Sequence, residues 1–380
     1  MVKTTHFQVD NGDMTLIELE SGRRILVDIK IRVATADDGD EDIPPVGDQL
    51  RERLKRDDKE RFYVDAFLLT HPDKDHICGL REHFHLGDPS TWSKKDDKII
   101  IREMWSSPIV FRRTSKNHKL CDDAVSWCDE ARRRVAKFKA EGAQADGNRI
   151  LIMGEDVDGK TDDLGAILIK TDEVFSKICG VVDFSFEARL LAPMKADNDD
   201  EEEVLTKNNS SVVMRIDLKL WSTTKARYLI GGDAEVAIWE KLWDRHKSRK
   251  SWLQYDVLIA PHHCSWHSLS WDSWSDLGEK AKVSPNARSA LGQPLLGALI
   301  VSSSKPIKDD KDDPPCIRAK REYLDILTEV NGEFRCVCDG ASDEPMEIEI
   351  LSAGPKVKRL KVAATVAATT GLGSQPFAHG

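Results

Sequence analysis

A group of histidines and aspartates follows three apolar runs of the sequence, VDAFLLT, RYLI and YDVLIA. In chain order its members are His71, Asp73, Asp75, His76, Asp233, His262 and His263. Imidazole and carboxylate together suit Zn, Mn or Fe, and an aspartate can bridge two ions. Two ions about 3.5–4 Å apart activate water and stabilise a leaving oxygen, which suits hydrolysis of a phosphodiester or an ester.

The elements that must position these side chains are β-strands. Near the N-terminus, HFQVD, MTLIELE and RILVDIKIR are expected to be paired strands separated by the turn signals NGD and SG. Near the C-terminus, EFRCVCDG and MEIEILS are expected to form a closing hairpin. Both halves of the chain are β-rich and finish with helices. This order predicts a four-layer α/β/β/α sandwich whose strand ends bring the ligands together.

Composition limits the partners and the compartment. The chain of 380 residues carries a net charge of -10, so it has no whole-chain basic signature of a nucleic-acid binder. Its first residues lack the apolar core of a signal peptide, and no run of about 18 apolar residues could span a membrane. The cysteines are scattered and are expected to be reduced thiols. We therefore expect a cytoplasmic protein with no membrane partner.

These motifs together resemble the metallo-β-lactamase fold superfamily, and in particular the soluble β-lactamase-like domain of the DNA-uptake protein ComEC and its stand-alone relatives. The superfamily motif H-x-H-x-D-H is present in the ComEC-like form H-x-D-x-D-H within THPDKDHICGL at 70–80. The segments VDNGDMTLIELESGRRILVD, NNSSVVMRI, LIGGDAE and DVLIAPHHCSWHS resemble further parts of that domain. The resemblance implies one metallo-β-lactamase-like domain over 1–353, with an insertion at about 81–207. The tail over 354–380 is rich in small residues and is expected to be disordered.

The resemblance also implies roles for individual residues. The implied metal ligands are His71, Asp73, Asp75, His76, Asp233 and His263, around two Zn or Mn ions with Asp233 as the bridge. The implied catalytic residues are Asp75, His262 and His263, where His262 and His263 divide between ligand and general acid.

Three residues are candidates for substrate binding, each with a structural alternative. Asn208 and Ser210 either hold an oxyanion or cap a strand. Trp266 either stacks on a base or packs in the core.

Two departures from the family pattern stand out. Cys264 occupies the place of a glycine, where it either narrows the pocket, serves as a soft ligand or packs as a small core residue. Relatives often have a last histidine after the strand that matches LIVSSS, and this chain has KPIKDDKDDPPC instead. Either Asp313 takes the place of that histidine or the ligand is missing.

The leading functional interpretation is a metal-dependent phosphodiesterase or nuclease that uses metal-bound hydroxide, with a nucleic acid or nucleotide as substrate. A second is hydrolysis of a small ester, a lactone or a cyclic nucleotide. A third is a degenerate fold that acts as an interaction module with a partner protein. The histidines and aspartates present at every main motif favour an enzyme, and the acidic net charge argues against long duplex DNA.

Overall fold

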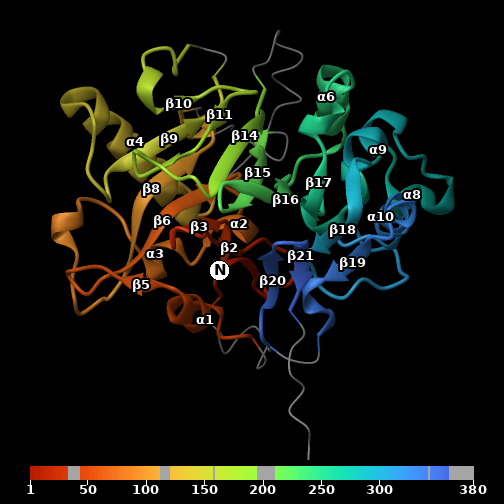
Figure 1. The fold of residues 1–380 in the computed structure, drawn as a ribbon, viewed down its shortest axis with the longest axis horizontal. Helices are drawn as coiled ribbons and strands as arrows, with labels where there is room; N and C mark the ends of the chain where they lie inside the picture. The colour runs from red at the N-terminus through yellow and green to blue at the C-terminus, as the bar shows by residue number, and fades with distance from the viewer. Residues whose placement is uncertain (33–42, 112–119, 157–158, 195–209, 341–342, 359–380) are drawn as a thin grey trace, which may run out of the picture.

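The computed structural model describes residues 1–32, 43–111, 120–156, 159–194, 210–340 and 343–358, which form a mixed α/β fold around two large β-sheets (Figure 1). The first sheet has the order β10 (Leu168–Ile169), β9 (Arg149–Met153), β8 (Ile99–Ser106), β6 (Phe62–Leu69), β3 (Arg24–Val27), β2 (Thr15–Glu18), β1 (Val2–His6), β20 (Met346–Leu351) and β21 (Gly354–Val357). Two short strands, β5 (Lys55–Arg56) and β7 (Phe84–His85), pair with β6 and β8.

The second sheet has the order β11 (Val174–Phe175), β14 (Phe186–Ala192), β15 (Val213–Leu220), β16 (Thr223–Ile230), β17 (Tyr255–Ile259), β18 (Pro294–Ser302) and β19 (Glu333–Cys336). A separate two-stranded hairpin joins β12 (Lys177–Ile178) to β13 (Val181–Val182). Within the described residues, no helix is both long and apolar enough to cross a membrane.

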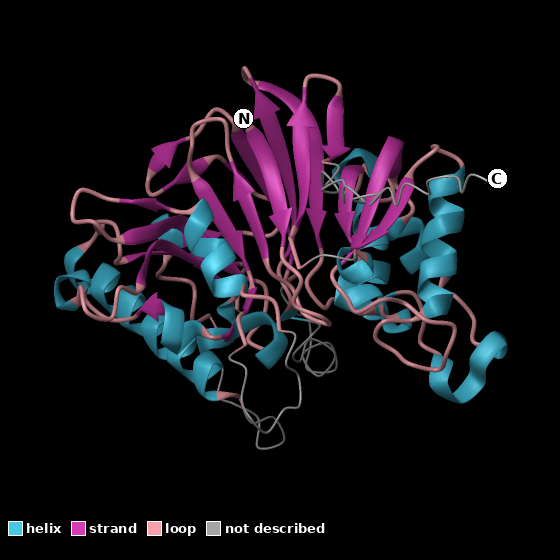
Figure 2. Cartoon of the chain, turned by 90° about the horizontal axis from the view of Figure 1, so that it is seen from below, coloured by secondary structure: helices cyan, strands magenta, loops and turns pink. Residues whose placement is uncertain are grey.

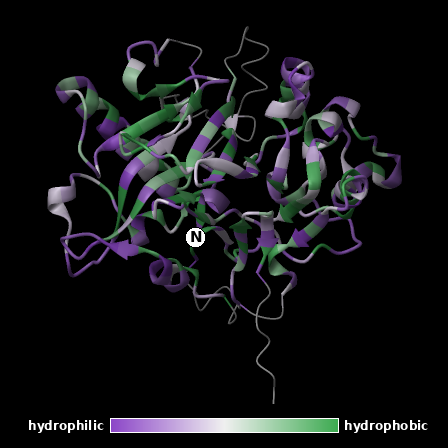
Figure 3. Ribbon diagram, in the orientation of Figure 1, coloured by the Kyte–Doolittle hydropathy of each residue, from purple (hydrophilic) through white to green (hydrophobic). Residues whose placement is uncertain are grey.

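Period-two alternation explains why each sheet is covered on both faces. In β15, Met214, Ile216 and Leu218 belong to a central core that also takes side chains from the first sheet, whereas Val213 belongs to an outer core. Helices line the outer cores: α1 (Val46–Arg53) and α4 (Asp122–Glu141) on the first sheet, and α6 (Val236–His246), α9 (Pro285–Leu291) and α10 (Ile317–Thr328) on the second. Figure 2 shows the strands in the middle with helices to either side, and Figure 3 shows hydrophobic residues along those strands.

Parallel pairing brings several strand ends to one edge of each sheet. Strand β6 runs parallel to β3 and β8, and β17 runs parallel to β16 and β18. The two sheets meet at this edge, where the backbone N–H of Val212, just before β15, donates to the carbonyl of Thr70, just after β6, over 3.0 Å. The residues that follow β3, β6, β16 and β17 therefore come together, as the sequence predicts for the last three.

Other expectations from the sequence need correction. The run HFQVD is not a strand: β1 ends at His6, and a loop closed by the hydrogen bond from Phe7 N to Met14 O (3.1 Å) follows it. The prediction that EFRCVCDG and MEIEILS form a closing hairpin is also wrong, because β19 pairs with β18 in the second sheet and β20 pairs with β1 in the first. Both strands carry apolar alternation, and that pattern does not say which sheet a strand joins.

Two domain boundaries can be compared with the structure. The described part of the expected insertion at about 81–207 supplies β8 and β9 to the first sheet and β14 to the second, so it is woven into both sheets. Strand β21 pairs with β20 over Gly354–Val357, so ordered structure continues past the expected boundary at 353. The rest of the tail, 359–380, lies outside the described residues.

A buried arginine of α4, held by an ion pair within the helix, joins α4 to the first sheet. Nε of Arg134 donates to Glu130 Oε1 over 2.7 Å, and its terminal nitrogens donate to the carbonyls of Arg149 and Ile101. The side chains of Arg134 and Glu130 are 1% and 3% exposed. Removing Arg134 takes this donor from two carbonyls and leaves the buried Glu130 with Arg133 as its one remaining arginine partner, over 2.7 Å.

We therefore expect Arg134→Met to lower the free energy of unfolding by about 3 kcal/mol. The matched control is Arg132→Met on the same helix, since the side chain of Arg132 is 48% exposed, and it should change stability by less than about 0.5 kcal/mol. Urea unfolding followed by circular dichroism measures both variants. Equal stability of the two variants would show that the buried arginine does not hold α4 in place.

Candidate metal centre

Short turns after the strands position the predicted ligands. After β6 the chain turns into the short helix α2 (Lys74–Ile77), which carries Asp75 and His76. Asp233 follows β16 through Gly232, whose φ is 49° and whose added Cβ would lie 3.0 Å from Cβ of Thr70. Glycine is needed there because the ends of the two sheets approach so closely.

The two adjacent histidines occupy an unusual turn after β17. The short helix α7 (Pro261–Cys264) contains His262, His263 and Cys264 with φ values of 50°, 52° and 68°. Three successive non-glycine residues in the left-handed region store strain, which such a turn keeps only when its surroundings hold it. Cys264 is fully buried in the core beside α10, which corresponds to the packing alternative for this residue.

The Asp233 carboxylate is the centre of the site. Its Oδ1 lies 3.0 Å from Nε2 of His76 and 3.6 Å from Nε2 of His263. Its Oδ2 lies 3.6 Å from Nε2 of His71 and 3.7 Å from Nε2 of His262. Each oxygen of this one carboxylate thus faces a different pair of imidazoles.

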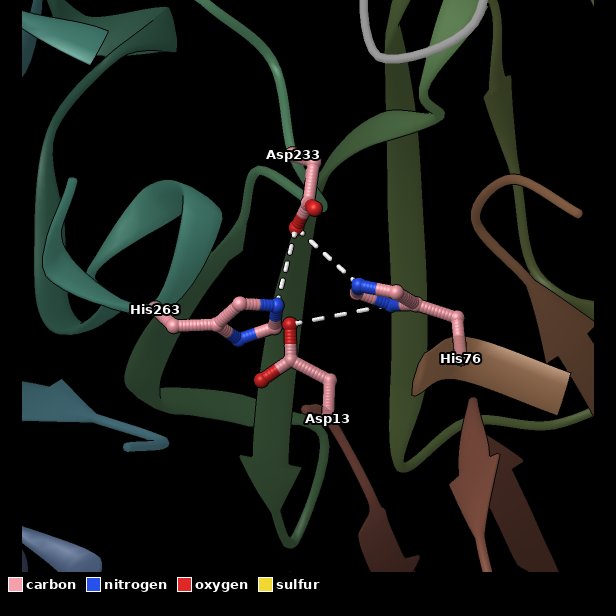
Figure 4. Close-up of side chains that lie close together, drawn as sticks. All are labelled: Asp13, His76, Asp233 and His263. Carbon is pink, nitrogen blue, oxygen red and sulfur yellow. Dashed lines mark ion pairs between the residues drawn. The ribbon is translucent and has the colours of Figure 1, made fainter. Parts of the chain in front are cut away.

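Asp13 is a further candidate ligand that sequence reasoning missed. Ligand atoms of Asp13, His76, Asp233 and His263 all lie within 4.8 Å of one another, and all four residues are buried. Figure 4 shows these side chains pointing toward one another from separate segments. The sequence predicts a turn at NGD, 11–13, and a turn signal alone gives no reason to place Asp13 among the ligands. The available signal was an aspartate just before the apolar run MTLIELE.

A second missed residue, Asp28, orients His76. Its Oδ2 accepts from Nδ1 of His76 over 2.8 Å and from the hydroxyl of Thr70 over 2.6 Å, and its Oδ1 accepts from Thr70 N over 2.7 Å. Because Nδ1 of His76 donates to this carboxylate, Nε2 is left to face Asp233. Carboxylates in this position commonly fix the tautomer of a metal-binding histidine. The sequence signal was an aspartate that ends the run RILVD.

The remaining predicted ligands lie at the rim. Oδ2 of Asp73 is 3.9 Å from Nε2 of His71, and the Asp73 side chain is 23% exposed. Oδ2 of Asp75 is 3.3 Å from Nε2 of His263, and the Asp75 side chain is 38% exposed. Asp73 thus lies beside His71, which faces Oδ2 of Asp233. Asp75 lies beside His263, which faces Oδ1.

Several polar atoms at this site are buried and make no well-aligned hydrogen bond, although ion-pair contacts of 3.0–3.6 Å link some of them to one another. They are Nε2 of His71, His76 and His263, Nδ1 of His262 and His263, and Oδ1 of Asp233. A buried nitrogen or oxygen without a partner is costly, and native structures seldom keep several together unless something else binds them. Imidazole nitrogens and a carboxylate oxygen are donors for Zn or Mn. The residues therefore fit a divalent metal ion.

The electrostatics of the site reflect this crowding. Burial works against the charge of Asp233, yet the neighbouring imidazoles of His76, His263 and His71 hold its pKa well below the usual range. Burial, reinforced by His76, lowers the pKa of His71 to about 3. Burial raises the pKa of Asp13 to about 6. His71 is thus kept neutral, which is the form that binds a metal ion.

The three predicted substrate-binding residues have different outcomes. Asn208 lies outside the described residues. Ser210 is 3% exposed and accepts from the hydroxyl of Ser107 through its carbonyl over 3.3 Å. Its neighbour Ser211, which we did not anticipate, accepts from Asp233 N through its hydroxyl over 3.2 Å. Trp266 is fully buried in the outer core of the second sheet, so in this structure its ring takes the packing alternative.

Comparisons with known proteins give little further information. No protein-family model matches the chain, and no curated protein matches it significantly. Among solved structures, the chain is similar to unliganded yeast PDE1, with a TM-score of 0.39 and 13% sequence identity over 88% of this chain and 97% of that one. A likeness at this level assigns neither fold family nor activity.

The geometry predicts that Asp13 contributes to metal binding. Replacing it by asparagine keeps its size and removes an anionic donor, so Asp13→Asn should weaken Zn or Mn binding by at least about tenfold. Competition with a chromophoric chelator measures the affinity, and mass spectrometry measures the bound metal. The control is Asp10→Asn in the same loop, because the Asp10 carboxylate pairs with Arg32 and is 30% exposed. Wild-type affinity in Asp13→Asn would remove Asp13 from the site.

Proposed function

We propose that this protein is a metal-dependent hydrolase of phosphodiesters, a phosphodiesterase or nuclease, built on the four-layer sandwich of the metallo-β-lactamase type. The observation that carries the proposal is the Asp233 carboxylate, whose two oxygens face two different pairs of histidines at 3.0–3.7 Å. A carboxylate shared in this way suits a pair of metal ions better than a single one.

The donors divide into two sets on either side of Asp233. Asp13, His76 and His263 would hold one ion together with Oδ1. His71 and Asp73 would hold the other together with Oδ2. Bound divalent ions supply a water nucleophile at neutral pH and neutralise the charge that develops on a phosphoryl group. Asp28 keeps His76 in the tautomer that this arrangement needs.

His262 is assigned the role of proton donor to the leaving oxygen. Its side chain is 16% exposed, whereas those of His71, His76 and His263 are at most 1% exposed. Of the four imidazoles, it is therefore the one that an incoming substrate can reach. Glu235 lies beside it, 34% exposed and with Oε1 4.0 Å from Nδ1 of His262.

The substrate class follows from the two proposed metal ions. Their positive charge would stabilise an anionic phosphodiester more than a neutral ester. We propose a nucleic acid or nucleotide as the substrate. A lactone, a small ester or a cyclic nucleotide is the competing class. An interaction module that acts with a partner protein is the non-enzymatic alternative.

The proposal predicts different results for the two adjacent histidines. His263→Ala should lower both turnover and bound metal, because it removes a ligand. His262→Ala should lower turnover at least tenfold and leave bound metal unchanged, because it removes a proton donor. The assay uses single-stranded DNA, RNA, a cyclic nucleotide, a generic aryl phosphodiester and a lactone, each with Zn or Mn.

The control is His85→Ala, since Nε2 of His85 contacts only the carbonyl of Asp88 and the hydroxyl of Thr91 in the described structure, and this variant should keep turnover within about twofold. Metal-loaded protein that is inert on phosphodiesters but active on the lactone would contradict the phosphodiester proposal and support the competing substrate class. Metal-loaded protein inert on every substrate would favour the interaction module.

A further inference from the structure

The connection between β18 and α10 contacts two ligand-bearing turns that are far apart in the sequence. This segment, 303–316, follows β18 and leads into α10. It touches the loop that carries Asp13 on one side and the turn that carries His263 on the other. We call it the bracket segment.

On the first side, the bracket segment holds the Asn11–Gly12 backbone. Nδ2 of Asn11 donates to the carbonyl of Pro314 over 2.9 Å, and Oδ1 of Asn11 accepts from Lys305 N over 3.1 Å. The hydroxyl of Ser303 donates to the carbonyl of Gly12 over 2.6 Å. Both ends of the Asn11 amide are thus used, and the residue just before Asp13 is fixed as well.

The close fit of Gly12 shows how tightly this loop is held. A Cβ added at Gly12 would lie 2.5 Å from Cδ of Lys30 and 2.8 Å from the carbonyl oxygen of Asp75. The loop therefore lies directly against the segment that carries two other predicted ligands. Small displacements of this loop would move Asp13 relative to His76.

On the second side, the bracket segment holds the histidine turn through Asp313. Oδ1 of Asp313 accepts from the hydroxyl of Ser265 over 2.6 Å and from Trp266 N over 3.0 Å. The backbone N–H of Cys316 donates to the carbonyl of Cys264 over 3.0 Å. These bonds hold the C-terminal end of the left-handed run His262, His263 and Cys264, whose backbone would not keep this conformation unaided.

Asp313 does not itself belong to the metal centre. Its Oδ1 is used by Ser265 and Trp266, and its Oδ2 lies 3.9 Å from Nε2 of His267, on the far side of that turn. The Asp313 side chain is 3% exposed, so the bonds that it accepts are shielded from water.

We propose that Asn11 and Asp313 are positioning residues that act through the bracket segment to hold Asp13 and His263 at the spacing a metal ion requires. The inference rests on the proposed metal centre and deepens it. A centre whose ligands come from separate loops binds metal tightly only if those loops are fixed before the ion arrives. The bracket segment joins two of these loops without supplying a ligand.

The test compares metal affinity with stability. Asp313→Asn keeps the shape of the side chain but weakens the bonds to Ser265 and Trp266, and Asn11→Ala removes both bonds to the bracket segment. Each variant should bind zinc at least about tenfold more weakly in competition with a chelator. Each should also shift the visible absorption of the cobalt-substituted protein, which reports ligand geometry. The matched control is Asp312→Asn, an exposed carboxylate one residue away, which should keep the affinity within twofold.

Thermal unfolding of the metal-free proteins separates positioning from general stability. The inference requires that Asp313→Asn lose affinity while its metal-free midpoint stays within about 2 °C of wild type. Ser303→Ala, which removes a single bond to Gly12, gives a milder second variant should Asn11→Ala fold poorly. Wild-type affinity and an unchanged cobalt spectrum in Asp313→Asn and Ser303→Ala would overturn the inference and leave the metal centre standing. Absence of metal binding by the wild-type protein would overturn both.

Discussion

The shared carboxylate of Asp233 is the constraint on which the rest of the site depends. A buried carboxylate is costly unless charged or hydrogen-bonded partners surround it, and here its partners are four imidazoles. These partners come from separate segments, so they can meet only where strand ends of both sheets converge. The parallel pairing of β16 with β17, and of β3 with β6, creates that convergence.

The predictable part of the site consists of ligands that follow long apolar strands. His71, Asp233 and His263 come directly after β6, β16 and β17, and the hydrophobic runs mark those strand ends in the sequence. Parallel neighbours end at the same edge, so proximity of these residues follows from the strand order. The helices α4, α6 and α10 are likewise visible as amphipathic periods of 3.6 residues.

Other features lie beyond what local sequence patterns specify. The contribution of Asp13 depends on a loop that reaches across the sheet edge instead of a tight turn, and contacts with Ser303 and Lys305 from a distant segment determine its path. Asp28 looks like an ordinary strand end until its bonds to Thr70 and His76 are seen. The placement of β19 and β20 in different sheets is equally unmarked in the sequence, because β20 pairs with β1 at the other end of the chain, whereas β19 pairs with β18 across α10.

The proposed two-ion site requires Asp233 to lie between both metal ions. Anomalous diffraction from crystals of the protein grown with Zn or Mn, recorded on both sides of the metal absorption edge, locates any bound metal. We expect two anomalous peaks, one beside each oxygen of the Asp233 carboxylate, with Asp13, His76 and His263 around the first and His71 and Asp73 around the second. Crystals that show no peak at Asp233, or whose metal lies elsewhere on the protein, would contradict the proposed two-ion site.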